Sequence, residues 1–422
     1  MTQLALPARA RHVPALGAEA TLVLGLFAFR WLAGIAENLA IPAFSQLAAL
    51  ALLAGLALMT LYRMRLAEDC TLFLTGILAW VATGIASFAA NPAADARTTM
   101  ALLTLLALYA LFANAALTHL RTPQALVWLY RLLALFITAG FALSALQIAT
   151  GTGFVEAGKA NIQRAYGSDV HPVSFAIQIT AALVAFEIAR TRLGRPFTAL
   201  HLAIMGAGAI TLYLTYARTA WLMALIIAAL ALISRGSWTR RLLLGGAGAL
   251  AGSALLVTSD RFTDLSSLPL FLANFSPADM VFDWRYIDNS LSWRIVNWSL
   301  GFTQAMEQPI LGFGPGQSAM SSYFNLEMHN IFLEALFEGG VFGLAALLLT
   351  LAGLARLHRR LPRQSACDRY SRTLANGFGL TLLLAVTFST SFVDQLMSFL
   401  LYILLLGAAA NPGNAGAGSS TP

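Results

Sequence analysis

A histidine stands where a long polar stretch of this chain meets an apolar one. The polar stretch covers residues 259–328, and His329 then opens the run HNIFLE, which leads into an apolar segment. Histidine is the side chain whose ordinary pKa lies closest to neutrality, so it suits proton transfer in catalysis. His329 is therefore the first candidate for chemistry, as a general base.

The elements that position this histidine are expected to be membrane-spanning helices. Hydrophobic residues make up 58% of the chain and charged residues 11%, and the mean hydropathy is +0.72, which excludes an ordinary soluble domain. Apolar windows long enough to cross roughly 30 Å of hydrocarbon recur along the chain, and in lipid such windows must be helical. We expect an all-α integral membrane protein of about twelve transmembrane helices. The expected spans are residues 20–36, 46–62, 71–90, 98–117, 125–149, 172–189, 197–215, 219–234, 242–258, 330–355, 373–391 and 395–410.

The distribution of charge predicts how these spans are oriented. Most of the 26 basic residues fall in alternate loops, and the positive-inside rule places those loops and both termini in the cytoplasm. Residues 1–422 then form a single polytopic domain of the inner membrane, with residues 259–328 as a large periplasmic loop between spans nine and ten. Residues 411–422 are rich in Gly, Ser and Ala and are expected to be disordered. The net charge of +7 reflects the same bias, so membrane lipids are expected as neighbours and no nucleic-acid partner is expected.

Five short motifs follow one another on the side predicted to face outward. They are RAYG at 164–167, YART at 216–219, RIVNW from Arg294, PILGFGPG at 309–316, and HNIFL at 329–333 followed by GGVFG at 339–343. This ordered set, over roughly residues 150–350, resembles the O-antigen ligase and O-antigen polymerase superfamily of bacterial envelopes. One departure is that Ala217 and Thr219 flank Arg218, where that superfamily often has Ser and Gly.

The resemblance implies a membrane-embedded, lipid-sugar-dependent glycosyltransferase. Such an enzyme moves an undecaprenyl-diphosphate-linked polysaccharide onto an acceptor hydroxyl at the periplasmic face. Arg164, Arg218 and Arg294 are then expected to bind the donor diphosphate, because the planar guanidinium fork pairs with phosphate oxygens. Arg218 and Arg294 join His329 as the expected catalytic residues. The outward loops contain no clustered carboxylates, so no metal or other cofactor is expected.

Each of these side chains also has a purely structural interpretation. Those interpretations are a helix cap for His329, a surface charge for Arg218, an ion pair with Asp283 or Asp288 for Arg294, and a helix start beside Pro172 for His171. For Arg164, a role in binding the donor and a purely structural role both remain open. The roles of Arg30 and Arg285 remain open.

The helix expected after His329 predicts what surrounds it. At 100° per residue, Gly340 and Gly343 stay on the face of His329 and would let a neighbouring helix approach closely. Glu334 and Glu338 project to the opposite face, where they must meet protein or water because lipid would not accommodate their charge.

Two classes of function fit these features. We favour transfer of finished O-antigen to the lipid A core, as in an O-antigen ligase, over an O-antigen or exopolysaccharide polymerase that joins repeat units to a growing polysaccharide. The competing class is a polysaccharide-lipid transporter or flippase, for which twelve spans is a common count. A transporter would gather its unusual residues near the bilayer midplane, whereas here they gather in the outward loops. The sugar, its linkage and the oligomeric state are not determined by the sequence.

Overall fold

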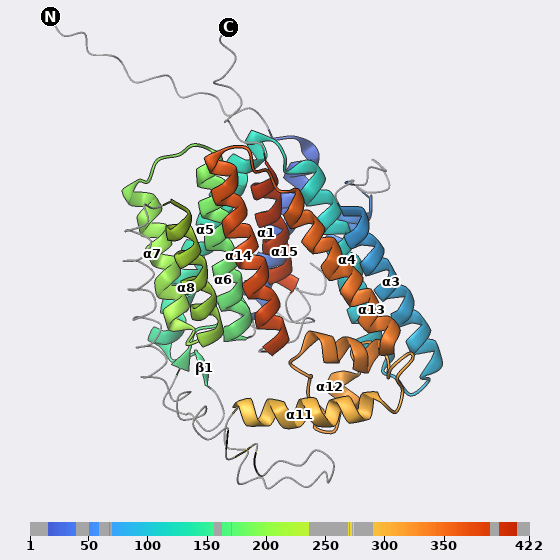
Figure 1. Cartoon of the computed structure of the whole chain (residues 1–422). Helices are drawn as coiled ribbons and strands as arrows, with labels where there is room; N and C mark the ends of the chain where they lie inside the picture. Colours follow the sequence, from blue (N-terminus) through green and yellow to red (C-terminus); the bar gives the residue numbers. More distant parts are fainter. Residues whose placement is uncertain are drawn as a thin grey trace, which may run out of the picture.

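The chain forms a bundle of long helices with a smaller helical layer across one end (Figure 1). The computed structural model describes residues 16–38, 50–58, 67, 70–155, 163–169, 171–235, 269, 271, 273, 290–388 and 396–411. The bundle helices are α1 (Ala18–Asn38), α3 (Thr71–Ala90), α4 (Ala96–His119), α5 (Pro123–Thr150), α6 (Pro172–Arg192), α7 (Ala199–Leu214), α8 (Arg218–Arg235), α13 (Ile331–Arg360), α14 (Ala366–Phe388) and α15 (Leu396–Ala410). Residues 50–58 are helical as well.

The end layer consists of two short strands and two helices. Strands β1 (Phe154–Val155) and β2 (Gln163–Arg164) form an antiparallel pair in which Phe154 lies opposite Arg164. Helix α11 (Ser290–Ala305) lies across the end of the bundle, and the single turn α12 (Ser318–Ser321) lies beside it (Figure 1). We call this the loop end of the bundle. Both helices fall within residues 259–328, so the predicted loop contains ordered helical structure.

The lengths and composition of the helices agree with an integral membrane protein. Six of the described helices are long and apolar enough to cross a membrane, namely α1, α3, α4, α5, α6 and α13. Helices α7, α8 and α15 are apolar but shorter. The predicted count of twelve spans stays a prediction, since the segment 242–258 lies outside the described residues.

Local sequence signals account for several helix boundaries. The hydroxyl of Thr122 accepts a hydrogen bond from the backbone of Ala125, and Pro123 follows as the first helical residue of α5. Helix α5 ends at Gly151, whose φ of 71° is the left-handed conformation that glycine adopts without strain. Helix α6 starts in the same way as α5, with His171 as its cap and Pro172 in its first turn.

Helices α6 and α15 form the centre of the bundle. Almost every residue of α6 is buried, and α15 is buried from Met397 to Ala409. The two helices pack against each other, and α4, α5, α7, α8 and α14 surround them. A helix that is apolar on all sides is stable only when protein or lipid covers all of it, and here protein covers it.

Small residues bring α3 and α13 into close contact. A Cβ atom built on Gly76 would lie 2.5 Å from the backbone nitrogen of Thr350, and one built on Gly353 would lie 2.4 Å from the Cα of Phe73. No larger side chain fits at either position without moving a backbone. Such small-residue crossings are typical of helix packing in membranes.

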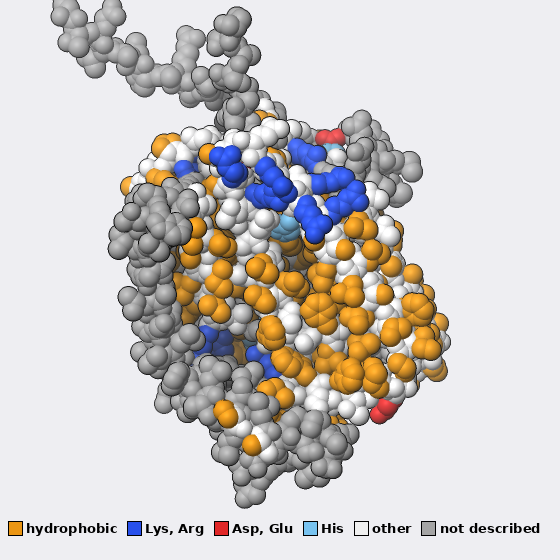
Figure 2. Space-filling view, viewed as in Figure 1, with side chains coloured by type: hydrophobic (Ala, Val, Ile, Leu, Met, Phe, Trp, Pro, Cys, Tyr) orange, Lys and Arg blue, Asp and Glu red, His pale blue; other side chains and the backbone are white. Residues whose placement is uncertain are grey.

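The face of the molecule in Figure 2 shows an apolar belt and a basic end. Leu78, Leu135 and Leu200 are each more than half exposed, as expected for side chains that face lipid. Most arginines between Arg356 and Arg372 lie in helices, because α13 continues to Arg360 and α14 begins at Ala366. The predicted basic loop is therefore shorter than its run of arginines. We call the end of the bundle that carries these arginines the arginine-rich end.

Candidate functional site

His329 lies immediately before α13, in a backbone conformation that few residues adopt. Its φ is 50°, and the only other non-glycine residues of the described chain with positive φ are Tyr216 and Asn325. The helix cap is the next residue, Asn330, whose side-chain oxygen accepts hydrogen bonds from the backbone of Phe332 and Leu333, each at 3.0 Å. The capping interpretation of His329 is therefore wrong. A strained backbone of this kind persists only where its surroundings hold it in place.

Helix α11 holds the backbone just before this histidine. The amide of Asn297 donates to the Glu327 carbonyl at 3.0 Å, and the indole of Trp298 donates to the Met328 carbonyl at 2.8 Å. Trp293, one turn earlier on the same helix, contacts the His329 ring edge to face, with the ring centres 5.7 Å apart. The motif RIVNW therefore serves to position the histidine, a role that the sequence alone did not assign to Asn297 or Trp298.

The environment of His329 keeps its imidazole neutral. Burial, and then the positive charges of Arg294 and His171, lower the pKa of His329 to about 4. Its Nδ1 atom is buried with no hydrogen-bond partner among the described residues. A neutral imidazole with an unpaired buried nitrogen can accept a proton or a hydrogen bond from a bound molecule.

Arg294 joins α11 to the end of α14. Its Nη1 atom donates to the carbonyl of Phe388 at 2.9 Å, and the rings of Trp298 and Phe388 lie 6.1 Å apart. Asp283 and Asp288, its possible ion-pair partners, lie outside the described residues. The guanidinium is half-buried and its charge acts on His329, so the structure brings these two predicted residues together.

His171 caps α6 and also belongs to the same electrostatic group. Its Nδ1 atom accepts a hydrogen bond from the backbone of Val173 at 3.2 Å, which confirms the helix-start interpretation. In the neutral ring the proton is therefore on Nε2. The charge of His171 acts on His329, although 157 residues separate them.

Arg164 and Arg218 belong to two segments that are hydrogen-bonded to each other at the loop end. The Nε atom of Arg164 donates to the Thr215 carbonyl at 3.0 Å, and the backbone of Ala165 donates to the Leu214 carbonyl at 2.9 Å. These bonds attach β2 to the turn that ends in Arg218, the first residue of α8. Both guanidinium groups are half-buried. Arg164 and His171 are seven positions apart in the chain, so one short segment carries a residue of this pair and a residue whose charge acts on His329.

Comparison with known families assigns this region. Residues 202–348 match the family model described as O-antigen ligase. The chain carries an O-antigen ligase domain. The match confirms the resemblance to the O-antigen ligase and polymerase superfamily, and it contains Arg218, Arg294 and His329. Arg164 and His171 lie before it. No curated protein matches the chain.

The O-antigen ligase domain contains a broken helix that the sequence did not predict. Helix α13 departs from helical geometry at Gly340, where φ is 61° and ψ is −155°. The segment 309–316 fills the break: the backbone of Phe313 donates to the Phe337 carbonyl at 2.9 Å, and Val341 donates to the Pro309 carbonyl at 2.8 Å. A Cβ atom on Gly340 would lie 2.2 Å from the carbonyl oxygen of Ile310. What approaches Gly340 is thus a loop backbone, and the predicted close approach of a neighbouring helix is wrong.

Polar residues of α3 and its C-terminal cap complete the support of this loop. The hydroxyl of Ser87 donates to the Glu338 carbonyl at 3.0 Å, and the amide of Asn91 donates to the Gly312 carbonyl at 2.8 Å. In the sequence, both are polar residues near the end of an apolar segment, and that pattern is too common at the ends of membrane helices to predict these contacts. At the break, the carbonyls of Phe337 and Glu338 and the N–H of Val341 therefore all have hydrogen-bond partners.

The two glutamates of α13 face protein, as predicted. Glu334 and Glu338 are each 5% exposed and approach the hydroxyl of Ser318, at 3.4 and 2.7 Å. They hold α12 against α13 beneath the candidate site. In the part of the chain that the structure describes, no three His, Cys, Asp or Glu side chains are grouped to hold a metal ion, and metal independence stays a prediction.

Proposed function

We propose that the protein transfers an undecaprenyl-diphosphate-linked O-antigen polysaccharide to a hydroxyl of the lipid A core, as an O-antigen ligase. The supporting observation is His329, a neutral, strained and partly unpaired histidine held beside Arg294 within an O-antigen ligase domain. The loop end faces the periplasm in this proposal, and the arginine-rich end faces the cytoplasm, in accord with the positive-inside rule.

The proposed reaction needs one base and one anion-stabilising group. His329 accepts the proton of the acceptor hydroxyl while that oxygen bonds to the anomeric carbon of the donor sugar. The bond between that carbon and the diphosphate oxygen breaks, and the lipid diphosphate leaves with the electron pair. Arg294 and Arg218, with Arg164, stabilise the charge that develops on the diphosphate. These arginines supply the positive charge that a metal ion supplies in other glycosyltransferases, so the proposed reaction is metal-independent.

Binding of the donor would also tune the base. Burial, and then the charge of Arg294, lower the pKa of His329 in the free protein. A diphosphate bound at Arg294 brings negative charge close to the ring, which favours the protonated form and raises that pKa. His329 then becomes a stronger base only when the donor is in place.

The broken helix does not favour a transporter over an enzyme. Discontinuous helices in transporters leave backbone groups free to bind a substrate or an ion. In α13 the carbonyls of Phe337 and Glu338 and the N–H of Val341 are hydrogen-bonded to the loop or to Ser87.

The lipopolysaccharide pattern of a deletion strain tests the proposal. A ligase deletion leaves complete core with no O-antigen bands. A polymerase deletion leaves a band of core carrying one repeat unit, and this result would replace our proposal by the alternative. Loss of the O-antigen bands with lipid-linked polysaccharide retained on the cytoplasmic side would indicate a flippase, whereas a ligase deletion leaves that polysaccharide on the periplasmic side.

A further inference from the structure

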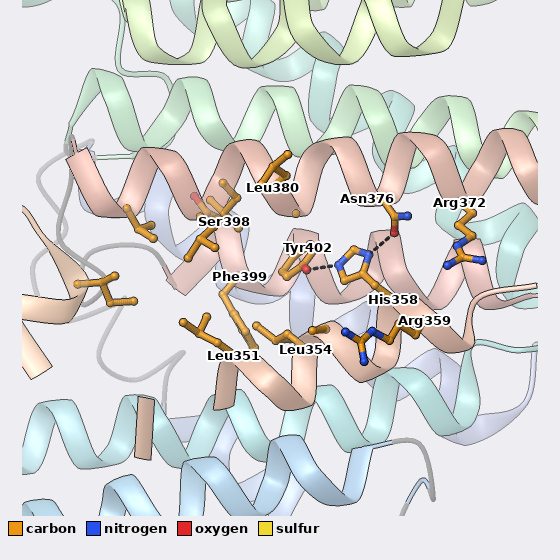
Figure 3. Close-up of a pocket in the computed structure, with 16 residues that line it drawn as sticks. Leu351, Leu354, His358, Arg359, Arg372, Asn376, Leu380, Ser398, Phe399 and Tyr402 are labelled. Atoms are coloured by element: carbon orange, nitrogen blue, oxygen red, sulfur yellow. Dashed lines mark hydrogen bonds between the residues drawn. The ribbon is translucent and has the colours of Figure 1, made fainter. Parts of the chain in front are cut away.

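A groove between α13, α14 and α15 is lined by none of the residues assigned to transfer. Its volume is about 320 Å³, at the lower end of the range for small-molecule pockets (roughly 300–1,000 Å³). One wall is α13, the other is α14, and Phe399 and Tyr402 of α15 form its floor (Figure 3). The groove extends from Ile331, two residues after His329, to Arg359 near the end of α13.

Most of the length of the groove is apolar. Leu351 and Leu354 line it from α13, and Leu380, Leu383 and Val386 line it from α14. Leu380 is 60% exposed, so this wall lies at the surface of the bundle. Figure 2 shows the surface hollowed below the basic cluster, beside the apolar belt. An apolar groove on the side of a bundle of membrane-spanning helices is in contact with hydrocarbon chains.

A histidine at the basic end of the groove has no spare hydrogen-bonding capacity. The Nδ1 atom of His358 lies 2.8 Å from the side-chain oxygen of Asn376, and Nε2 is hydrogen-bonded to the hydroxyl of Tyr402 (Figure 3). Because the Asn376 oxygen only accepts, Nδ1 donates, and the neutral ring accepts from Tyr402. Gly379 makes room for this arrangement, since a Cβ atom there would lie 2.8 Å from Nε2. His358 therefore shapes the groove wall and does not bind an occupant.

Two guanidinium groups remain at this end of the groove. Arg359 of α13 is exposed and Arg372 of α14 is half-buried, and both lie at the same end of the groove, on opposite walls (Figure 3). Neither has an acidic partner among the described residues. Two arginine forks at one end of a groove suit a phosphate group, and basic pockets between transmembrane helices bind anionic lipid headgroups.

We propose that this groove binds one anionic phospholipid, with its phosphate between Arg359 and Arg372 and an acyl chain along the apolar part. A lipid bound there would contact both α13, which follows His329, and α14. The last residue of α14, Phe388, accepts a hydrogen bond from Arg294. The proposal does not depend on the transfer reaction.

The test is lipid binding by the purified full-length protein in an uncharged detergent. Phosphatidylglycerol and phosphatidylcholine with identical acyl chains are titrated, and bound lipid is counted by native mass spectrometry. Phosphatidylglycerol should bind tighter, at one saturable site. The double variant R359Q/R372Q should lose at least about tenfold in phosphatidylglycerol affinity, with phosphatidylcholine binding unchanged.

The chain offers a matched control in R356Q/R369Q. It removes the same charge from the same two helices, but neither arginine lines the groove. This variant should bind phosphatidylglycerol as the unchanged protein does. Leu383→Trp, which fills the apolar part, should weaken both lipids and gives a second test if R359Q/R372Q does not fold. Unfolding temperatures without lipid identify variants that fold.

Four results would overturn the proposal. Equal loss in both double variants would indicate general surface charge, and equal binding of the two lipids by the unchanged protein would remove the role of the arginines. If glycerol 3-phosphate displaced phosphatidylglycerol when both were present at the same concentration, the groove would be a site for a free phosphate compound. A polyprenyl diphosphate that binds through Arg359 and Arg372, with no phosphatidylglycerol bound, would assign the groove to a different lipid.

Discussion

The indole of Trp298 donates a hydrogen bond to the carbonyl of Met328, 2.8 Å away, and so holds the residue before His329. Trp298 is on α11 and His329 begins the approach to α13, so this bond fixes the histidine relative to the helix that carries Arg294. Trp298→Phe keeps an aromatic ring but removes the donor. A hydrogen bond contributes about 0.5–1.5 kcal/mol, so we expect transfer to fall roughly two- to tenfold at unchanged membrane abundance. Trp128→Phe, at an exposed position on α5, is the matched control. Equal activity of both variants would mean that other contacts suffice to hold His329.

Replacement of His329 separates catalysis from folding. His329→Ala should lower the transfer rate by roughly 10²- to 10⁴-fold, because the base is lost. Asn and Gln should not restore it, since either forms hydrogen bonds but neither accepts a proton near pH 7. All three variants should insert normally, because Asn330 caps the helix. Transfer is measured together with membrane abundance, and near-normal transfer by the Ala variant would exclude His329 as the base.

The pH dependence of transfer should report the buried imidazole. Because the pKa of His329 is lowered to about 4, the ring stays neutral at pH 5–6, where an exposed histidine would be protonated. The acid limb of kcat/KM should therefore lie near pH 4, with activity lost as the pH falls through that value. The acid limb of kcat should lie at higher pH, since the bound diphosphate raises the pKa. Removing a positive neighbour with Arg294→Gln should shift the kcat/KM limb upward. An acid limb of kcat/KM near pH 6.5 in the unchanged protein would contradict this account.

The arginines should need their forked shape as well as their charge. Arg218→Lys and Arg294→Lys keep a positive charge but lose the paired donors, so donor-dependent transfer should fall at least tenfold. Arg164→Lys should have the same tendency with a smaller effect, which acts partly through the loss of its bond to Thr215. Rates at saturating and limiting donor are compared at equal protein levels. Full activity of the Lys variants at both 218 and 294 would assign those residues to structure.

Gly340 should tolerate no side chain. Gly340→Leu places a Cβ atom 2.2 Å from the carbonyl oxygen of Ile310 and imposes a positive φ on a residue that disfavours it. We expect a large fall in the amount of folded protein in the membrane. Gly206→Leu on α7 is the control, because nothing lies within 4 Å of a Cβ atom there. Detergent-extracted protein is measured by size-exclusion chromatography, and normal recovery of the Gly340 variant would show that the break in α13 is not required.

Composition and local signals determine much of this protein by themselves. Apolar windows predict helices such as α3 at the residues where they are found, and Pro172 after His171 predicts the start of α6. The ordered motifs identify the superfamily and single out His329 and Arg294, which the structure brings together. These features depend on residues near one another in the chain or on the solvent in which the chain lies.

Tertiary structure alone decided the rest, because it depends on contacts between distant residues. Residues 330–355 are predicted as one continuous apolar helix, but α13 is broken at Gly340, where the segment 309–316 supplies hydrogen bonds to its backbone. The lowered pKa of His329 comes from burial and then from the charges of Arg294 and His171, and all three depend on how distant segments pack. The groove likewise exists only between packed helices, so no single segment encodes it.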